Sequence, residues 1–530
     1  MMPKTDRATS VGRAYRLATF AIIGAGLIWR VARYLANWPL WGDEAYIAVS
    51  LLTRDFAGLT RPLEYYQIAP PGFLWAELAS IRVLGASELT LRLVPFLCGI
   101  GSLLLFWRLA EKTLGKRPAL MAIALFSASF YPIRHANEVK PYSSDLFLSL
   151  VMTLLALAAW DRPASKRVWA ALALVSAIGV WVSYPLILVS GGLGIVLGWK
   201  VMAGRAGERT LVAWPLLFIT ITVASWTVMY GLVARPQALA APFLTQMDTW
   251  EDSFPPVLRP WALPWWLLKT HTGNMLAYPY GGNHFGSVLT TLIVVAGGIS
   301  LWRRDRSLLI LLLAPIGPAL VAAALHRYPY GTSARISLFM APAICLLAGR
   351  GLASIILRFV PRRLVRTTLL GTTAGLGIVA IAGAVFSFAV PYKDIDDLEL
   401  KQIVQSFAAE SRPGDRWIGF NGLLTLPRVK QIMLMPWLQH AAQFHFYVLR
   451  DAPVPVDWNP GPLGSIPKTT GRIWFLIHTF GYDHVPVDLL EAYISHLVRR
   501  HGPPEKRKID VRKNEDVEAL IFPPQRDHRR

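Results

Sequence analysis

Residues 17–36 read LATFAIIGAGLIWRVARYLA, and WGDEA follows at residues 41–45. The first stretch is an apolar run of about the 20 residues that an α-helix needs to cross a bilayer. Similar apolar runs recur along the chain as far as Val390. The first run is long and no small-residue cleavage site follows it, so we expect a retained span rather than a removed signal peptide. The sequence therefore predicts a polytopic α-helical membrane protein.

The composition agrees with this class. The chain has 530 residues, of which 54% are hydrophobic and only 16% are charged, and its net charge is +21. Such a charge is typical of nucleic-acid-binding proteins, but here the basic residues fall between the apolar runs, where the positive-inside rule expects them. Nucleic acid is therefore not expected as a partner. Cys98 and Cys345 both lie within apolar runs, which indicates packing residues rather than a disulfide.

Eleven spans are predicted, and the basic clusters between them orient the chain. These clusters fit the cytoplasmic side when the N-terminus is cytoplasmic, and an odd number of spans then places the C-terminal segment outside. At Tyr184-Pro185 two spans abut, and we interpret this join as a turn. The predicted spans are residues 17–36, 89–110, 118–133, 143–160, 168–184, 186–202, 211–232, 286–302, 307–325, 336–357 and 367–390.

Two large outer loops are expected at residues 37–88 and 233–285. Within the first, Glu44–Phe56 and Pro71–Leu84 are too short to span, so we expect both to lie along the membrane surface as interfacial helices. The second is rich in aromatic residues, and two interpretations stay open: interfacial anchors, or a sugar-stacking or lid role. Its aromatic residues include Trp250, Trp261, Trp265, Trp266, Tyr278 and Tyr280.

Residues 391–530 have a different composition and are predicted to form a small outer α/β domain. Helices are expected at Asp394–Glu410 and Val487–Arg500, and strands at Arg416–Phe420, Arg472–Ile477 and Val517–Phe522. This region has no Gly-rich phosphate loop, so no nucleotide is assigned to it.

Three outer segments carry the residues that a site needs. Asp43 and Glu44 follow the first span, which also suits the acidic first turn of a helix. The short join 134–143 holds four potentially charged groups at the mouth of the bundle, where charges are costly unless they serve a site. The join 326–335 carries Arg327 and Arg335, whose guanidinium groups match phosphate oxygens bidentately, although an interfacial Arg/Tyr anchor is the simpler alternative.

Carboxylates facing phosphate-binding cations beside a bilayer suggest one reaction. A carboxylate would take the proton of a hydroxyl acceptor, which attacks the anomeric carbon of a sugar on a lipid phosphate, and the cations would hold the departing phosphate.

With these elements the chain resembles the polytopic GT-C glycosyltransferases of the protein O-mannosyltransferase and aminoarabinose-transferase kind. The matching motifs cover about residues 35–345. They are Trp41-Gly42-Asp43-Glu44, Ala69-Pro70-Pro71-Gly72, Leu91-Arg92-Leu93-Val94-Pro95, Glu138-x-Lys140-Pro141-Tyr142-Ser143 and Tyr328-Pro329-Tyr330-Gly331…Arg335.

The resemblance implies a GT-C catalytic domain over residues 1–390, a periplasmic domain over 391–530, and a place in a bacterial inner membrane. It implies a polyprenyl-phosphate-linked sugar donor and a glycan, lipid or protein acceptor. By position, Asp43 is the base, Glu44 a supporting carboxylate and Glu138 the acid of the second loop. Lys140 and Arg335, with Arg327 and Arg134, would bind the donor phosphate, and the substrate-binding candidates are Tyr142, His135, Tyr328, Tyr330 and His271.

Some family members hold a divalent metal ion at acidic and histidine positions. This chain shows no clear set of four ligands, so a metal is left open, with Glu44, Glu138 and His326 as its candidate ligands.

Two other classes of protein fit less well. A flippase or transporter of an amphiphilic substrate would show paired repeats and midplane polar groups, whereas the acids here cluster at one face. A phosphoethanolamine-type transferase needs a metal-rich soluble domain, but His440, His445, His478 and His484 lack ligand spacing. The sequence encodes neither the sugar nor the acceptor in any motif.

Overall fold

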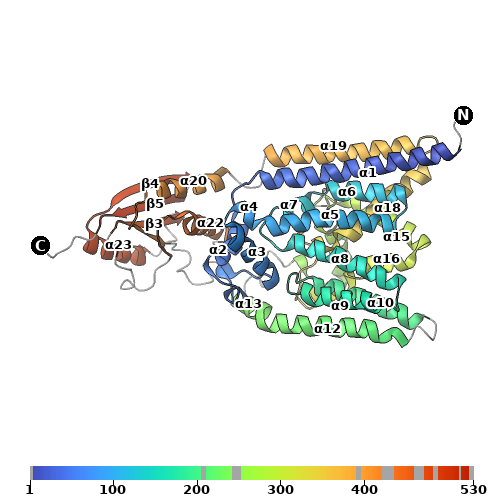
Figure 1. The fold of residues 1–530 in the computed structure, drawn as a ribbon, viewed down its shortest axis with the longest axis horizontal. Helices are drawn as coiled ribbons and strands as arrows, with labels where there is room; N and C mark the ends of the chain where they lie inside the picture. The colour runs from blue at the N-terminus through green and yellow to red at the C-terminus, as the bar shows by residue number, and fades with distance from the viewer. Residues whose placement is uncertain are drawn as a thin grey trace.

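The computed structural model describes residues 4–204, 210–241, 252–283, 285–389, 395–420, 435–458, 469, 471–480, 487–512 and 515–524. The molecule is elongated, with a bundle of long helices at one end and a smaller α/β domain at the other (Figure 1). Short helices from the first outer loop lie between these two parts. Trp250 and His484 fall outside the described residues.

The long helices of the bundle run in roughly the same direction (Figure 1), and α1 packs against α5 and α6. The helices of this part are α1 (Lys4–Leu35), α5 (Leu93–Thr113), α6 (Lys116–Ala128), α7 (Phe130–His135), α8 (Tyr142–Asp161), α9 (Lys166–Gly179), α10 (Leu186–Ala203), η3 (Thr210–Val212), α12 (Ala213–Met229), the π-helical turn η4 (Tyr230–Ala234), α13 (Arg235–Ala240), α15 (Val288–Arg304), α16 (Arg306–Leu313), α17 (Ile316–Ala324), η9 (Leu338–Met340), α18 (Ala341–Phe359) and α19 (Val365–Ala389).

Among the described residues, eight helical segments are long and apolar enough to cross a membrane. The other three predicted spans contain helices α6, α9 and α15, which have 13, 14 and 17 residues. The predicted class of polytopic helical protein is therefore confirmed, whereas the count of eleven spans stays a prediction. Between α9 and α10 the chain turns at residues 180–185, as the Tyr184-Pro185 join predicts.

Small residues let some helices of the bundle touch through their backbones. A Cβ atom at Gly297 of α15 would lie 1.9 Å from the carbonyl oxygen of Leu347 in α18. A Cβ atom at Gly351 of α18 would lie 1.9 Å from the carbonyl oxygen of Ile293. Close approach at glycines is a usual means of helix association in membranes, because apolar burial alone does not drive it there. The two helices therefore pack as one unit.

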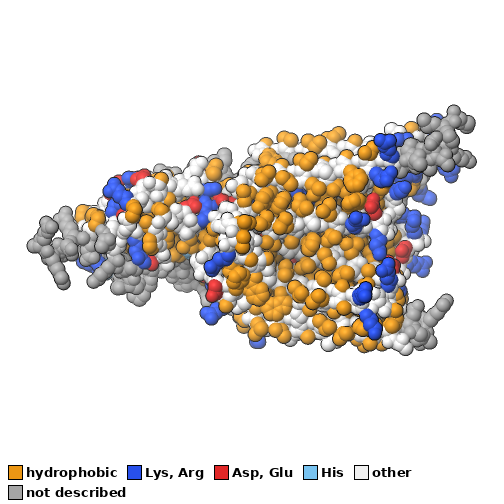
Figure 2. Space-filling model, in the orientation of Figure 1, with side chains coloured by type: hydrophobic (Ala, Val, Ile, Leu, Met, Phe, Trp, Pro, Cys, Tyr) orange, Lys and Arg blue, Asp and Glu red, His pale blue; other side chains and the backbone are white. Residues whose placement is uncertain are grey.

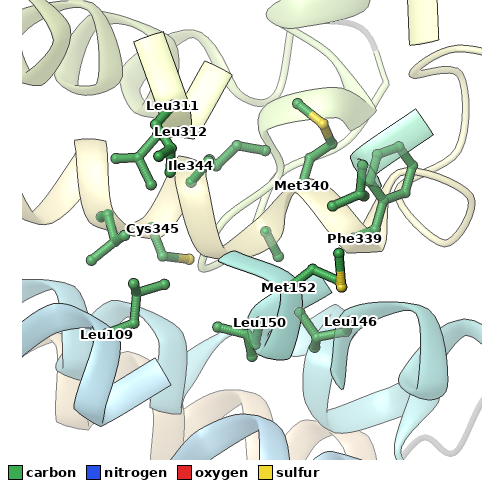
Figure 3. Close-up of a cluster of buried hydrophobic side chains, with 14 of the residues drawn as sticks. Leu109, Leu146, Leu150, Met152, Leu311, Leu312, Phe339, Met340, Ile344 and Cys345 are labelled. Carbon is green, nitrogen blue, oxygen red and sulfur yellow. The ribbon is translucent and has the colours of Figure 1, made fainter. Parts of the chain in front are cut away.

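Apolar side chains from α5, α8, α16 and α18 fill the interior of the bundle (Figure 3). Leu150 and Leu346 are fully buried there, as is Cys345. Cys345 therefore has the packing role that its apolar surroundings in the sequence predict. The sides of the bundle are largely covered by apolar side chains, and Lys and Arg gather at the end remote from the α/β domain (Figure 2). The predicted orientation stays a prediction.

The first outer loop folds into α2 (Gly42–Thr53), η1 (Gly58–Thr60), η2 (Glu64–Tyr66), α3 (Pro71–Leu84) and α4 (Glu88–Leu91). The prediction of an interfacial helix near Glu44–Phe56 is wrong, because α2 is buried over most of its length and packs against a helix of the C-terminal domain. In contrast, α3 exposes Val83 and Leu84 at its end, as an interfacial helix would. The second outer loop contains η7 (Pro260–Ala262), α14 (Leu263–His271) and η8 (Asn274–Leu276).

The C-terminal part contains a five-stranded sheet of order β2-β1-β3-β5-β4. β1 pairs in parallel with β2 and β3, and β5 is antiparallel to both β3 and β4. The predicted helices and strands occur here, while α22, β2 and β4 were not predicted. The elements are α20 (Ile395–Glu410), β1 (Arg416–Phe420), α22 (Met435–Asp451), β2 (Val456–Trp458), β3 (Ile473–Phe480), α23 (Val487–His501), β4 (Glu505–Arg512) and β5 (Glu515–Phe522).

Candidate active site

Asp43 lies in the first turn of α2, at the junction between the helical bundle and the C-terminal domain. The chain enters this helix in extended conformation at Trp41, and the Trp41 backbone N–H donates to Oε2 of Glu44 at 3.3 Å. Successive residues of a helix point in directions about 100° apart. The side chains of Asp43 and Glu44 consequently enter different surroundings.

Asp43 binds two cations that come from distant parts of the chain. Its Oδ1 lies 3.1 Å from Nζ of Lys140, and its Oδ2 lies 3.0 Å from Nη1 of Arg335. The exposed fractions of these side chains are 18% for Asp43, 7% for Lys140 and 31% for Arg335. Lys140 also donates to Oε1 of Gln67 at 2.9 Å. The predicted base and the two predicted phosphate-binding cations thus lie together, within reach of water.

The two cations set the protonation of Asp43. Burial by itself raises the pKa of this carboxyl, but Lys140 and Arg335 lower it, and the net shift is downward. An opposite charge within hydrogen-bond distance favours the ionised form. Asp43 is therefore an ionised carboxylate of reduced basicity while both cations hold it.

Glu138 forms a second ion-pair group beside the first. Its Oε1 accepts from Nε of Arg134 at 2.8 Å, and its Oε2 lies 2.6 Å from Nδ1 of His135. Burial raises the pKa of Glu138, yet His135 and Arg134 together lower it well below its ordinary value. Glu138 is therefore held as a carboxylate that orients Arg134, whose guanidinium lies 5.9 Å from the ring centre of Trp41.

Glu44 is sealed inside the protein. Both of its oxygens accept from Arg92, at 2.8 Å each, and its Oε1 also accepts from the backbone N–H of Val139. The side chains of Glu44 and Arg92 are 0% and 3% exposed. Arg92 in turn donates to the carbonyl oxygens of Trp38 and Pro39. Glu44 therefore ties the first outer loop to the loop that carries Glu138 and Lys140.

Aromatic side chains lie on one side of the cluster that Asp43 forms with Lys140 and Arg335. The Arg335 guanidinium lies 5.9 Å from the ring centre of Tyr142, which makes an edge contact of 5.1 Å with His135. Tyr328 is held in place by a hydrogen bond from its hydroxyl to the carbonyl oxygen of Ile336. The predicted candidates Tyr142 and His135 thus line the site itself.

The other candidates lie apart from these contacts. The Tyr330 hydroxyl lies 3.1 Å from Nε2 of His271, and Tyr330 also packs against Trp266 of the second outer loop. His326 is exposed and stacks on Phe254. Arg327 is exposed, and no ion pair of Arg327 is found among the described residues.

The candidate metal ligands do not form a site. Glu44 is held by Arg92, Glu138 by Arg134 and His135, and His326 lies on Phe254. In the part of the chain that the structure describes, no three carboxylate, imidazole or thiol side chains could hold one ion. The residues therefore do not fit the divalent metal that the family resemblance left open.

Several residues of the site were missed in the sequence. Arg92 belongs to a quoted motif, but its pairing with Glu44 was not predicted, and Gln67 was not singled out at all. A signal existed only for Arg92, because a buried carboxylate needs a cationic partner.

Comparisons with known proteins support this architecture. Residues 69–231 match the profile of the family described as dolichyl-phosphate-mannose-protein mannosyltransferase. The crystal structure of ArnT from Cupriavidus metallidurans in the apo state superposes with a TM-score of 0.56, covering 97% of this chain and 98% of that chain at 13% identity. The chain has the fold of ArnT. The comparison with curated proteins finds no match.

A second crystal structure, of the same ArnT bound to undecaprenyl phosphate, superposes with a TM-score of 0.54 at 13% identity and the same coverage. The family match contains Arg92, Glu138 and Lys140, whereas Asp43 and Arg335 lie outside it. The predicted resemblance to GT-C proteins of the mannosyltransferase and ArnT kind is therefore confirmed, and with it the predicted fold class of helical bundle and small C-terminal sheet domain.

Proposed function

We propose that this protein is a membrane glycosyltransferase that moves a sugar from a polyprenyl-phosphate donor to a hydroxyl acceptor at the outer face. The observation that carries the proposal is the bridge of Asp43 between Lys140 and Arg335. One carboxylate and two phosphate-binding cations are the groups that this reaction needs. The match to a dolichyl-phosphate-mannose family and the fold of an ArnT that binds undecaprenyl phosphate support the choice of donor.

In the proposed reaction Asp43 takes the proton of the acceptor hydroxyl. The acceptor oxygen then bonds to the anomeric carbon of the sugar, and the bond between this carbon and the phosphate oxygen breaks. The departing polyprenyl phosphate changes from a diester with one negative charge to a monoester that gains a second. Lys140 and Arg335 stabilise that developing charge, and such aimed charges are usually a large part of catalysis.

The same two cations serve Asp43 and the donor phosphate in turn. In the structure both cations are bound to Asp43, which lowers the pKa of its carboxyl. A donor phosphate that binds Lys140 and Arg335 replaces Asp43 as their partner, and the pKa of Asp43 then rises toward its ordinary value. Binding of the donor thereby makes Asp43 a stronger base at the moment when the base is needed.

Arg134 and Glu138 complete the proposed site. Glu138 fixes the guanidinium of Arg134 near Trp41, and this places a third cation at the mouth of the site. Tyr142 offers its ring and hydroxyl group to the sugar, and the buried His135 supports Tyr142 through their edge contact. The proposed sugar is a hexose or a pentose, and the proposed acceptor is a glycan, a lipid or a protein.

Purified protein in liposomes tests the proposed function. With a sugar-loaded polyprenyl phosphate and a hydroxyl acceptor extract, we expect release of free polyprenyl phosphate and sugar on the acceptor. If the protein instead moves intact donor across the bilayer with no bond broken, the proposed glycosyltransferase function is wrong and the protein is a flippase.

We also propose that the site faces the periplasm of a bacterial inner membrane. The gathering of Lys and Arg at the opposite end of the bundle supports this orientation. A reporter that is active only in the periplasm, fused after Tyr392, is expected to give signal. A cytoplasm-only reporter that is active at this position overturns the orientation.

A further inference from the structure

The C-terminal domain contacts the first outer loop, which carries Asp43, through helix α22. This helix packs against α2, whose first turn carries Asp43. The interface is buried, since Leu40, Gln443 and Tyr447 are all 0% exposed. No motif in the sequence of this domain predicts a part in the site.

Two side chains of α22 hold the backbone just before Asp43. The Leu40 N–H donates to Oη of Tyr447 at 2.9 Å, and Nε2 of Gln443 donates to the Leu40 carbonyl oxygen at 2.8 Å. Leu40 lies three residues before Asp43 and one residue before Trp41, where α2 is capped. Because both polar groups of one peptide residue are bound by a single helix, the path of the chain into α2 is fixed in position and direction.

A second set of contacts holds α22 itself against the membrane part. Arg450 lies 2.7 Å and Lys401 of α20 lies 2.8 Å from the two oxygens of Glu88. The Tyr65 hydroxyl lies 2.8 Å from Nδ1 of His445, which stacks on Trp458 at 3.8 Å. The outer helices and α22 therefore form a single packed layer.

The opposite side of the same turn is held by the membrane part. Arg92 donates to the carbonyl oxygens of Trp38 and Pro39, on the other side of Leu40 from Asp43. Residues 38–40 thus lie between Arg92 of the bundle and α22 of the C-terminal domain. Asp43 meets Lys140 and Arg335 only if this short segment keeps its place.

We infer that Tyr447 and Gln443 of α22 are positioning residues for Asp43, so that the C-terminal domain completes the active site rather than only attaching to it. The catalytic part of this inference rests on the proposed function. Its geometric part, that α22 fixes the segment before Asp43, can be tested without any activity. A misplaced catalytic group costs rate because the reacting atoms are no longer aligned.

The test compares Tyr447→Phe with Tyr65→Phe in the full-length protein. Each change removes one hydroxyl group from a buried hydrogen bond between the first outer loop and α22, but only Tyr447 bonds the segment that leads to Asp43. Gln443→Leu serves as the second variant on the Leu40 side. Hydrogen exchange followed by mass spectrometry is measured on peptides that cover residues 38–46.

We expect faster exchange at residues 38–46 in Tyr447→Phe and Gln443→Leu but not in Tyr65→Phe. For transfer, we expect kcat per folded molecule to fall about 10-fold to 100-fold in the first two variants, with the donor KM not raised. The acid limb of the kcat/KM profile is expected to move to higher pH, because a displaced Asp43 loses contact with Lys140 and Arg335.

Equal exchange at residues 38–46 in wild type and Tyr447→Phe overturns the inference. So does faster exchange with wild-type kcat and pH profile, because the contact would then be structural only. If the wild-type protein transfers no sugar at all, the proposed function fails, while the exchange result still decides whether α22 positions this segment.

Discussion

Asp43 and Glu44 belong to two ion-pair regions that differ in their access to water. The first joins Asp43 to Lys140 and Arg335, with exposed fractions from 7% to 31%. The second joins Glu44 to Arg92, whose side chains have exposed fractions of 0% and 3%. An ion pair near water can exchange its partners at modest cost, whereas a buried pair cannot be opened without leaving an uncompensated charge. The open region therefore suits catalysis, and the sealed region holds the loops that carry it.

The largest effect is expected from Asp43→Asn. The amide keeps the shape of the side chain but removes its basicity, a role that is worth about 10²–10⁴-fold in rate. Transfer is expected to fall by this factor while the protein folds and binds donor. Asp55→Asn is the control, because Asp55 is an exposed carboxylate of the same outer loop that caps a turn at Gly58.

Near-wild-type transfer by Asp43→Asn would falsify the assignment of Asp43 as the base. The chemistry would then belong to another carboxylate, with Glu138 as the next candidate.

Glu44→Gln is expected to act on stability instead. It leaves Arg92 buried without a counter-charge, and loss of one partner of a buried pair costs about 3–5 kcal/mol. The free energy of unfolding in detergent is the measurement. Asp161→Asn breaks the exposed pair with Lys112 and is expected to cost at most about 1 kcal/mol. Similar losses in the two variants would remove the contrast between a sealed and an open region.

Arg335→Ala is expected to weaken donor binding. Loss of a charged hydrogen-bond partner costs about 1.5–3 kcal/mol, which corresponds to about 10–150-fold in affinity. Arg335→Lys should recover only part of this, because an ammonium group cannot form a bidentate contact. Turnover at saturating donor should fall as well, since the phosphate gains charge in the transition state.

Arg327→Ala is the matched control in the same loop. Its guanidinium is exposed, and we expect little change in donor affinity. A larger effect at Arg327 than at Arg335 would place the phosphate elsewhere on this loop.

The smallest expected effect is a difference in pH between the acid limbs of the kcat profile and the kcat/KM profile. Because Lys140 and Arg335 lower the pKa of Asp43 in the free protein, activity should fall only as the pH drops through that lowered value. The acid limb of the kcat/KM profile reports the pKa of the base in the free enzyme. The acid limb of the kcat profile reports the pKa of the base in the donor complex. We expect the kcat limb at higher pH, since the donor phosphate takes the two cations. Coinciding limbs would show that Asp43 keeps its cations when donor binds.

The fold class was predictable because apolar runs and basic clusters are local signals. The site was predictable in part, since Asp43, Lys140 and Arg335 each stand at an outer join of the sequence. Their direct ion pairs were not, because no local pattern shows which residues meet across 292 positions of the chain.

The burial of α2 was missed for the same reason. A short apolar helix with an acidic first turn fits a membrane surface as well as a protein interior, and the helix that covers it lies about 400 residues later. His445, interpreted as one of several scattered histidines, is a buried partner of Tyr65 in this contact. Tertiary partners decide such cases, and a single sequence does not display them.

The glycine contact between α15 and α18 limits the path by which a lipid can enter the bundle. At Gly297 and Gly351 the two backbones touch so closely that even a methyl group does not fit. An isoprenoid tail is at least as thick as a methyl group, so this seam is closed to it along the contact. In the proposed reaction, a polyprenyl donor would therefore reach Asp43, and its spent carrier would leave, by another flank of the bundle.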